Sequence, residues 1–211
     1  MSKRTEQISG THQRIVDAAV TLHGSIGPAR TTIAGIAEKA GVTRLTIYRH
    51  FPDEEALFSA CSTHWLSEQQ LPNPEEWSRH TDPLERLTVG LSDLYRFYRG
   101  GEFYRGGEAM LTRIYADWRA LPQTRRAALA STNAHFRNIL LEPFPEPDRN
   151  SRFNATLSHA VSFWTWRSLC HDNGLSDDDA VDVMSILITT AVHAPETPDA
   201  PPPENAGVRG Q

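Results

Sequence analysis

Cysteine is scarce in this sequence. The 211 residues contain only Cys61 and Cys170, which lie far apart and form no CxxC pair. A disulfide-stabilised scaffold is therefore excluded, and we expect two buried free thiols in a reducing compartment. Long apolar runs are also missing, since none approaches the roughly 18–20 residues that span a bilayer. The N-terminal MSKRTEQISG has no apolar signal-peptide segment, so we predict a cytoplasmic protein with no membrane partner.

Positive charge is scarce as well. The net charge of −5 argues against a protein that coats nucleic acid through bulk charge. Residues 1–64 contain seven Lys or Arg and six Asp or Glu, so they carry +1 and the remainder carries −6. The sign of this weak asymmetry fits an N-terminal DNA-binding unit on an acidic body. Length and composition are those of a globular protein of one large domain or two small ones.

Signatures of catalysis and of metal binding are missing from the sequence. The nine histidines are scattered and form no HExxH motif or compact cluster with Cys and Asp. No serine stands in a GxSxG nucleophile context. We therefore predict no catalytic residues, no metal site and no cofactor. An all-helical enzyme that uses the histidines of the body is the least favoured alternative.

Helical periodicity is present in nearly every segment, and no alternating strand pattern stands out. We predict an all-α fold of about nine helices. The first runs over about 11–26 and ends at Gly27. Thr32 and Thr43 stand at the N-cap positions of two short helices, and Gly41 between them can adopt the positive φ of a tight turn. The three helices have the spacing of a helix-turn-helix domain.

The predicted organisation has two units and a tail. A helix-turn-helix domain occupies 1–52. A helical domain for ligand binding and dimerisation occupies 53–193, and its first segment, 53–70, is a connecting helix capped by Asp53. Residues 194–211 are rich in Pro, Glu, Asp and Gly, so we predict a disordered tail.

The last two predicted helices, about 151–173 and 177–193, are apolar on more than one side. A helix with two apolar sides must bury both. One side can pack on its own domain, and a second copy of the chain is an economical partner for the other. We therefore predict a homodimer through this pair of helices. The alternative is that they form the centre of a monomer core.

The second helix of the predicted motif turns polar and basic side chains outward. Arg44 can bind guanine through two hydrogen bonds, Thr46 can contact a base edge, and Leu45 suits a thymine methyl. Tyr48 and His50 can donate to phosphate oxygens, and the N-terminus of the preceding helix can hold a phosphate. On an isolated helix the same residues would fit an ordinary polar surface. The predicted DNA-binding residues are Thr32, Thr43, Arg44, Leu45, Thr46, Tyr48 and His50.

Between Ile15 and Phe58 the sequence contains a series of short motifs: IVDAA, a helix stop at Gly27, TTI at 31–33, IAEKAGV at 36–42, TIYRHF at 46–51 and EALF at 55–58. In these motifs it resembles the N-terminal domain of the TetR family of transcriptional regulators. The resemblance implies a homodimer whose N-terminal domains bind a palindromic double-stranded DNA operator. It also implies that the C-terminal domains dimerise through their last two long helices and bind an inducer, which alters the separation of the DNA-binding domains and usually relieves repression.

Some positions depart from the family pattern. His23 stands where a buried aromatic is usual, and Leu45 replaces a small residue at the tip of the reading helix. Glu54 occupies a position where the family often has a lysine that contacts phosphate, and a carboxylate there would weaken backbone binding. Two functions therefore stay open: a ligand-responsive repressor, and a small-molecule- or partner-binding protein of the same fold with weak or lost operator binding.

Aromatic and methionine side chains gather in the middle helices of the body. So many bulky rings are hard to pack without a gap, and pockets between helices are usually apolar with a few polar groups. We therefore expect an apolar or aromatic small-molecule inducer, although each ring alone is more often core than pocket. The candidate ligand-binding residues are Trp65, Tyr95, Tyr98, Met110, Trp118, His135, His159, Phe163 and Trp166, with Asn133 and Arg113 as further candidate polar groups.

Overall fold

The computed structural model describes residues 3–100 and 107–193, which form helices and loops and contain no strand. The predicted tail, 194–211, lies outside these residues. Three elements are 3₁₀-helices (η1–η3), η4 is a π-helix, and the others are α-helices. In chain order they are α1 (Lys3–Ile26), η1 (Pro28–Arg30), α2 (Ile33–Ala40), α3 (Arg44–His50), α4 (Glu54–Ser67), α5 (Pro74–Trp77), α6 (Pro83–Arg99), α7 (Gly107–Ala116), η2 (Trp118–Ala120), α8 (Gln123–Leu141), η3 (Glu146–Asp148), α9 (Ser151–Ala160), α10 (Phe163–Trp166), η4 (Arg167–Asp172) and α11 (Asp177–His193).

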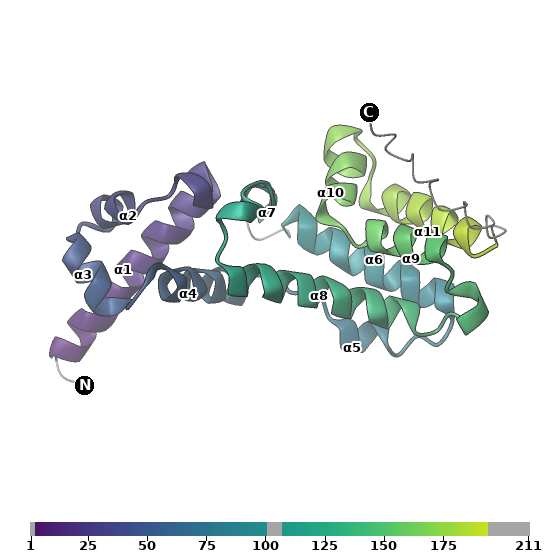
Figure 1. Ribbon diagram of the computed structural model, residues 1–211, viewed down its shortest axis with the longest axis horizontal. Coiled ribbons are helices and arrows are strands. Elements are labelled where there is room, and N and C mark those ends of the chain that lie inside the picture. The colour runs from purple at the N-terminus through teal and green to yellow at the C-terminus, as the bar shows by residue number, and fades with distance from the viewer. Residues whose placement is uncertain (1–2, 101–106, 194–211) are drawn as a thin grey trace, which may run out of the picture.

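The molecule is elongated, as Figure 1 shows. Helices α1–α4 lie at one end, α6, α8, α9 and α11 lie side by side at the other, and α7 lies between the two groups. The all-α class predicted from the periodicity is confirmed. The described residues form eleven α-helices rather than about nine, because a short helix forms in a predicted loop and one long predicted helix is broken.

The N-terminal core is built from the apolar sides of α1–α4. Three short helices begin at the predicted caps: Thr32 Oγ1 accepts from the Gly35 N–H, Thr43 Oγ1 from the Thr46 N–H, and Asp53 from the Ala56 N–H. Helix α1 begins at Lys3 rather than near residue 11. The buried residues of this core are Ile15, Val16, Ala18, Ala19, Ile36, Ala37, Ala40, Ile47, Phe51, Leu57 and Cys61.

Helix α4 contributes to both ends of the molecule. Leu57 and Cys61 are buried in the N-terminal core. Trp65, two turns further along, packs on the larger core of the body. The helix is therefore shared between the two groups of helices, and a division of the chain into domains at residue 52 remains a proposal.

The body is organised around α6, which packs against α5, α7, α8 and α11. Gly90 of α6 has no Cβ, and an added Cβ would clash with Leu140, so glycine allows the close approach of α8. Nearby, the buried Arg86 donates to the carbonyls of Ser78, His80 and Ile139 and pairs with a Glu142 carboxylate oxygen at 2.8 Å. These bonds satisfy the buried guanidinium and hold α5, α6 and α8 together.

The chain does not form one helix over 151–173, and the sequence-based prediction of a continuous helix there is wrong. It forms α9, α10 and the π-helix η4 instead. Two buried tyrosines of α6 occupy the break: the Tyr95 hydroxyl donates to Ala160 O at 3.0 Å and the Tyr98 hydroxyl to Val161 O at 2.7 Å. Backbone carbonyls freed by the break are thereby satisfied, which makes a buried helix interruption tolerable.

Candidate functional site

The helix-turn-helix geometry is set by a glycine and an isoleucine. Gly41 adopts φ of 67°, the left-handed conformation that glycine favours, and ends α2. The Val42 N–H then donates to Ala37 O at 2.9 Å, which turns the chain into α3. Ile47 is only 1% exposed and seats α3 against the N-terminal core. Its burial turns the opposite side of α3 to solvent.

The solvent-facing side of α3 carries most of the predicted DNA-binding residues. Arg44, Leu45 and Tyr48 are exposed, with Leu45 60% exposed, and Leu45 packs on nothing in the N-terminal core. The hydroxyls of Thr43 and Thr46 lie 2.9 Å apart, so each already has a hydrogen-bond partner within the helix. They remain at the N-terminal end of α3, where they can also meet a base edge.

The other two predicted DNA-binding residues lie at the margins of this surface. Thr32 is exposed and caps α2, so the N-terminus of α2 faces solvent. His50, in the last turn of α3, is half-buried, and its ring lies 6.0 Å from that of His12 of α1. Glu54 is exposed in the first turn of α4, directly after Asp53.

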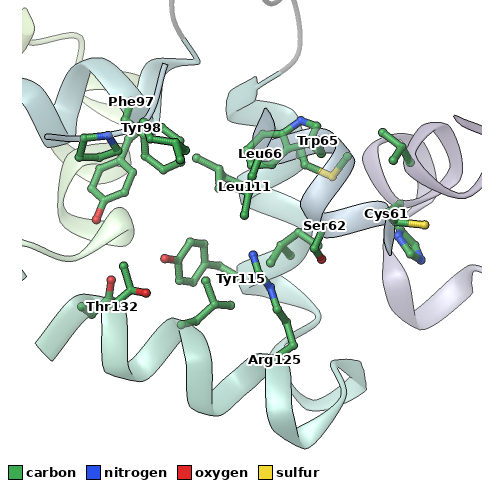
Figure 2. A pocket seen from close by; sticks show the side chains of 18 of the residues that line it. Cys61, Ser62, Trp65, Leu66, Phe97, Tyr98, Leu111, Tyr115, Arg125 and Thr132 are labelled. Carbon is green, nitrogen blue, oxygen red and sulfur yellow. The ribbon is translucent and has the colours of Figure 1, made fainter. Parts of the chain in front are cut away.

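A second candidate site is a cavity of about 270 Å³ between α1, α4, α6, α7 and α8. Ligand pockets usually occupy about 300–1,000 Å³, so this one suits a small compound. Figure 2 shows its wall, with Trp65, Leu66 and Leu111 on one side and Thr132 and Arg125 of α8 opposite. The described lining residues are Val20, His23, Phe58, Cys61, Ser62, Trp65, Leu66, Leu71, Pro72, Phe97, Tyr98, Met110, Leu111, Ile114, Tyr115, Arg125, Leu129, Thr132, Asn133 and Phe136.

The cavity collects some of the predicted ligand-binding residues and not others. Trp65, Tyr98, Met110 and the polar candidate Asn133 line it. Elsewhere are Tyr95, Phe163 and Trp166, which are buried in the body core, Trp118 in η2, the exposed His135 and His159, and Arg113 of α7.

The sequence analysis did not select Arg125, the one permanent charge among the described residues of the wall. Arg125 points from α8 into the space between Tyr115 and Ser62 (Figure 2). No carboxylate among the described residues lies within ion-pairing distance of it, and burial lowers its pKa. Leu129 and Phe136 follow Arg125 at positions that share one side of a helix. A cation within this apolar stripe was the sequence feature that could have identified Arg125 as a cavity residue.

The N-terminal end of the molecule forms part of the cavity wall. Val20 and His23 of α1 line the cavity, and the His23 ring packs on Phe58 at 4.9 Å between centroids. Burial lowers the pKa of His23 to about 4, so this side chain is neutral near pH 7. A compound in the cavity therefore touches α1 directly.

Helix α7 joins the cavity to the end of α1. One side of α7 lines the cavity through Met110. One turn further along α7, Arg113 Nε donates to Gly24 O at 2.9 Å, and just after the helix Asp117 accepts from the Ala29 N–H at 2.9 Å. A displacement of α7 would thus pull on the C-terminal end of α1 and on η1.

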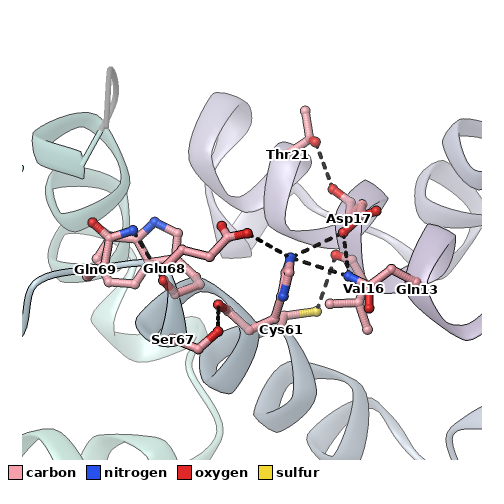
Figure 3. A network of polar contacts seen from close by, with 10 residues as sticks. Gln13, Val16, Asp17, Thr21, Cys61, Ser67, Glu68 and Gln69 are labelled. Atoms are coloured by element: carbon pink, nitrogen blue, oxygen red, sulfur yellow. Dashed lines mark hydrogen bonds and ion pairs between the residues drawn. The ribbon is translucent and has the colours of Figure 1, made fainter. Parts of the chain in front are cut away.

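A polar cluster, shown in Figure 3, ties α4 to α1. His64 Nε2 lies 3.2 Å from Asp17 and 3.6 Å from Glu68, and Gln13 Nε2 also approaches it at 3.3 Å. Gln13 donates in turn to Asp17 at 2.8 Å. These groups are partly exposed, so the cluster positions the two helices with modest energy.

Within residues 3–100 and 107–193, no helix is long and apolar enough to cross a bilayer. The same residues hold no group of three or more His, Cys, Asp or Glu side chains arranged to bind a metal ion. Taken with the geometry above, the fold and the exposed α3 define a helix-turn-helix protein of the all-α class.

Comparison with known proteins finds a family match for the N-terminal helices. Residues 15–61 match the model of the bacterial regulatory proteins of the tetR family. The chain is 40% identical over 87 residues to the HTH-type transcriptional regulator TtgR of Pseudomonas putida, covering 40% of this chain and 41% of that protein. It is 43% identical over 60 residues, 28% of each chain, to the HTH-type transcriptional regulator AcrR of Shigella flexneri. These matches span less than half the length of the relatives.

A solved structure extends the likeness to the whole fold. A TetR-like transcriptional regulator from Rhodococcus sp. RHA1 superposes with a TM-score of 0.56 at 19% identity, over 86% of this chain and 95% of that one. The N-terminal helices therefore resemble those of the tetR-family regulators, and over the rest of the chain the likeness is one of fold alone.

Proposed function

We propose that the protein is a ligand-responsive transcriptional repressor that binds a palindromic operator as a homodimer. The observation that carries this proposal is the shared wall of the cavity, because α1 belongs to the core that seats the reading helix and also touches the cavity. A compound that fills the cavity favours one position of α1 over others, and a ligand shifts an equilibrium only through such differential contact.

In this proposal α3 enters the major groove. Arg44 and Leu45 contact base edges together with Thr43 and Thr46, since these side chains lie at the N-terminal end of the exposed side. Tyr48 and His50 contact phosphates, as does the N-terminus of α2 that Thr32 caps. The protein then acts in the cytoplasm, where it meets DNA.

An exposed apolar strip supports the homodimer. Val183, Ile186 and Leu187 of α11 share one side of the helix, and Ile186 is 65% exposed. Trp164 of α10, just before the π-helix, is also exposed. Apolar side chains gathered in this way mark association surfaces. Ile186→Glu should convert a dimer to a monomer in sedimentation experiments, and an unchanged mass would exclude this face.

Repression is tested with DNA that flanks the protein's own gene in a mobility-shift assay. We expect a palindromic segment to shift at low salt and to be released by a compound that raises the melting temperature of the protein. If no palindromic segment shifts and Arg44→Ala has no effect, the repressor proposal fails.

A second candidate function, ligand or partner binding with weak operator affinity, is favoured by the charge at the start of α4. Three consecutive acidic residues are exposed at this helix start: Asp53, Glu54 and Glu55. Glu54→Lys should tighten DNA binding and steepen its salt dependence. Each additional neutralised phosphate steepens the plot of the logarithm of the binding constant against the logarithm of the salt concentration by about 0.9. Glu75→Lys, an equal change on the exposed side of α5, serves as the matched control. DNA binding that appears only in Glu54→Lys would favour the second function.

A further inference from the structure

The described residues that line the cavity include a positively charged side chain but no carboxylate. Of the described lining residues, Arg125 has the only permanent charge, and none is Asp or Glu. His23 is neutral at pH 7, and burial raises the pKa of the Cys61 thiol to about 12, so this group is also neutral. A cavity with a single positive charge and apolar walls discriminates strongly between anionic, neutral and cationic compounds.

Among the described residues, Arg125, Arg126 and Arg137 of α8 are partly buried without a carboxylate partner, and of these three only Arg125 lines the cavity. Arg86, Arg96, Arg149 and Arg167 each lie within about 3 Å of a carboxylate oxygen, as a partly buried guanidinium usually does. Arg125 has no such partner within 4 Å in the described part of the chain, although it is partly buried and burial lowers its pKa. Its charge is therefore available to a bound anion.

An acidic group, Glu55, shares a second cavity with Arg125. In this smaller cavity the Glu55 carboxylate accepts from the Thr124 hydroxyl at 2.5 Å. This carboxylate is exposed and already hydrogen-bonded. It is the competing partner that an experiment must exclude.

Neutral polar groups adjoin Arg125 in the main cavity. The Tyr115 side chain is hydrogen-bonded to Asn133, and burial raises the pKa of its phenol, which stays a hydrogen-bond donor. Ser62 of α4 and Thr132 of α8 add hydroxyls on two different sides of the cavity (Figure 2). A planar guanidinium with neighbouring hydroxyl and amide donors matches a carboxylate, which accepts two parallel hydrogen bonds. The rest of the described lining, which includes Trp65, is mostly apolar.

We propose that the cavity binds an apolar monoanion, with the carboxylate held by Arg125, Tyr115 and Asn133 and the hydrocarbon body against Trp65 and Phe136. This inference rests on the proposed ligand response and names the chemical class of the ligand. One cation and few donors suit a single negative charge, whereas a phosphate dianion or a sugar would leave polar groups unsatisfied against aromatic walls.

The test uses three compounds with one ring system: naphthalene-2-carboxylate, its primary amide and naphthalen-2-ylmethylammonium. Dissociation constants are measured calorimetrically on the full chain without DNA, at pH 7. We expect the carboxylate to bind about tenfold more tightly than the amide and the cation to bind most weakly, as is typical of a charge-assisted bidentate pair. Equal affinities of carboxylate and amide, or no binding of any compound at millimolar concentration, would overturn the proposal.

Variants separate Arg125 from general effects on the cavity. Arg125→Gln should reduce carboxylate affinity to that of the amide and leave amide affinity within about twofold, whereas Arg125→Lys should keep part of the preference. Arg119→Gln, at an exposed position of η2, and Glu55→Gln should both preserve it. Melting curves confirm that each variant is folded. A preference that survives Arg125→Gln contradicts the proposal.

DNA release is measured separately, so that the two proposals fail independently. If the amide and the carboxylate bind equally and both release the operator, the monoanion proposal fails and the repressor proposal stands. If the carboxylate binds selectively through Arg125 but leaves a protein–DNA complex intact, the ligand class is supported and the ligand response is not.

Discussion

The reading helix and the cavity obtain their functional side chains in opposite ways. In α3 seven consecutive residues supply both the buried seat and the exposed surface, so local sequence determines which side chains face outward. In the cavity the wall comes from five helices that are distant in sequence, and its charged group is contributed by α8 alone. A surface set by local periodicity withstands changes at one exposed residue, whereas an enclosed wall depends on the packing of every helix around it.

The largest expected effect contrasts two neighbours in α3. Ile47→Ala removes a fully buried side chain, so the free energy of unfolding should fall by about 2–5 kcal/mol. Leu45→Ala, at an exposed position of the same helix, should change it by less than about 0.5 kcal/mol and affect only DNA preference. Denaturant titration of both variants checks this. Equal losses of stability would contradict the assignment of the two sides of α3.

The next effect concerns His23, which lines the cavity from α1. Its pKa is lowered by burial from 6.5 to about 4 in the folded state. Above pH 6.5 both states are neutral and stability is unaffected. Between pH 6.5 and about 4 only the unfolded state takes up the proton. The free energy of unfolding therefore decreases as the pH is lowered through this range, by about 3 kcal/mol in all.

His23→Phe should abolish that part of the acid sensitivity, which denaturant titrations at pH 7.5 and 4.5 measure. The matched control is His135→Phe at an exposed position of α8, which should keep the pH dependence of the parent protein. If His23→Phe is as acid-sensitive as the parent, the burial of a neutral histidine between the cavity and α1 is disproved.

A smaller effect separates two roles within the reading surface. Arg44→Ala should weaken operator binding by about 1–3 kcal/mol and relax preference at one base pair. Tyr48→Phe should weaken binding about equally for all sequences, because its hydroxyl is assigned to phosphate. Binding to a set of single-base operator variants distinguishes them. The division of roles is wrong if both changes act equally on every sequence.

The smallest effect is expected at the partly exposed polar cluster that ties α4 to α1. His64→Gln removes the pairing with Asp17 and Glu68, and such pairs contribute about 0.2–1 kcal/mol. The melting temperature should therefore change little, while ligand-induced release of DNA should weaken if the cluster helps to position α1. His171→Gln, an equal change on η4, is the control. A ligand response identical in both variants would exclude this role.

Local features of the fold were predictable because they depend on neighbouring residues. The caps Thr32, Thr43 and Asp53 were placed correctly, since a cap is a contact within one turn. The break after Ala160 was missed, because it is stabilised by tyrosine hydroxyls from α6, more than sixty residues earlier in the chain. Tyr95 consequently lies in the core, where the sequence suggested a ligand contact.

The candidate site divides in the same manner. Amino-acid order by itself determined the helical class, the turn at Gly41 and the exposure of Arg44, because helical period and glycine conformation act over a few residues. Only the tertiary structure decided that α1 lines the cavity and that Arg125 enters it with no carboxylate partner among the described residues. Such placements follow from how helices distant in sequence pack together, and burial and charge pairing are properties of that packing.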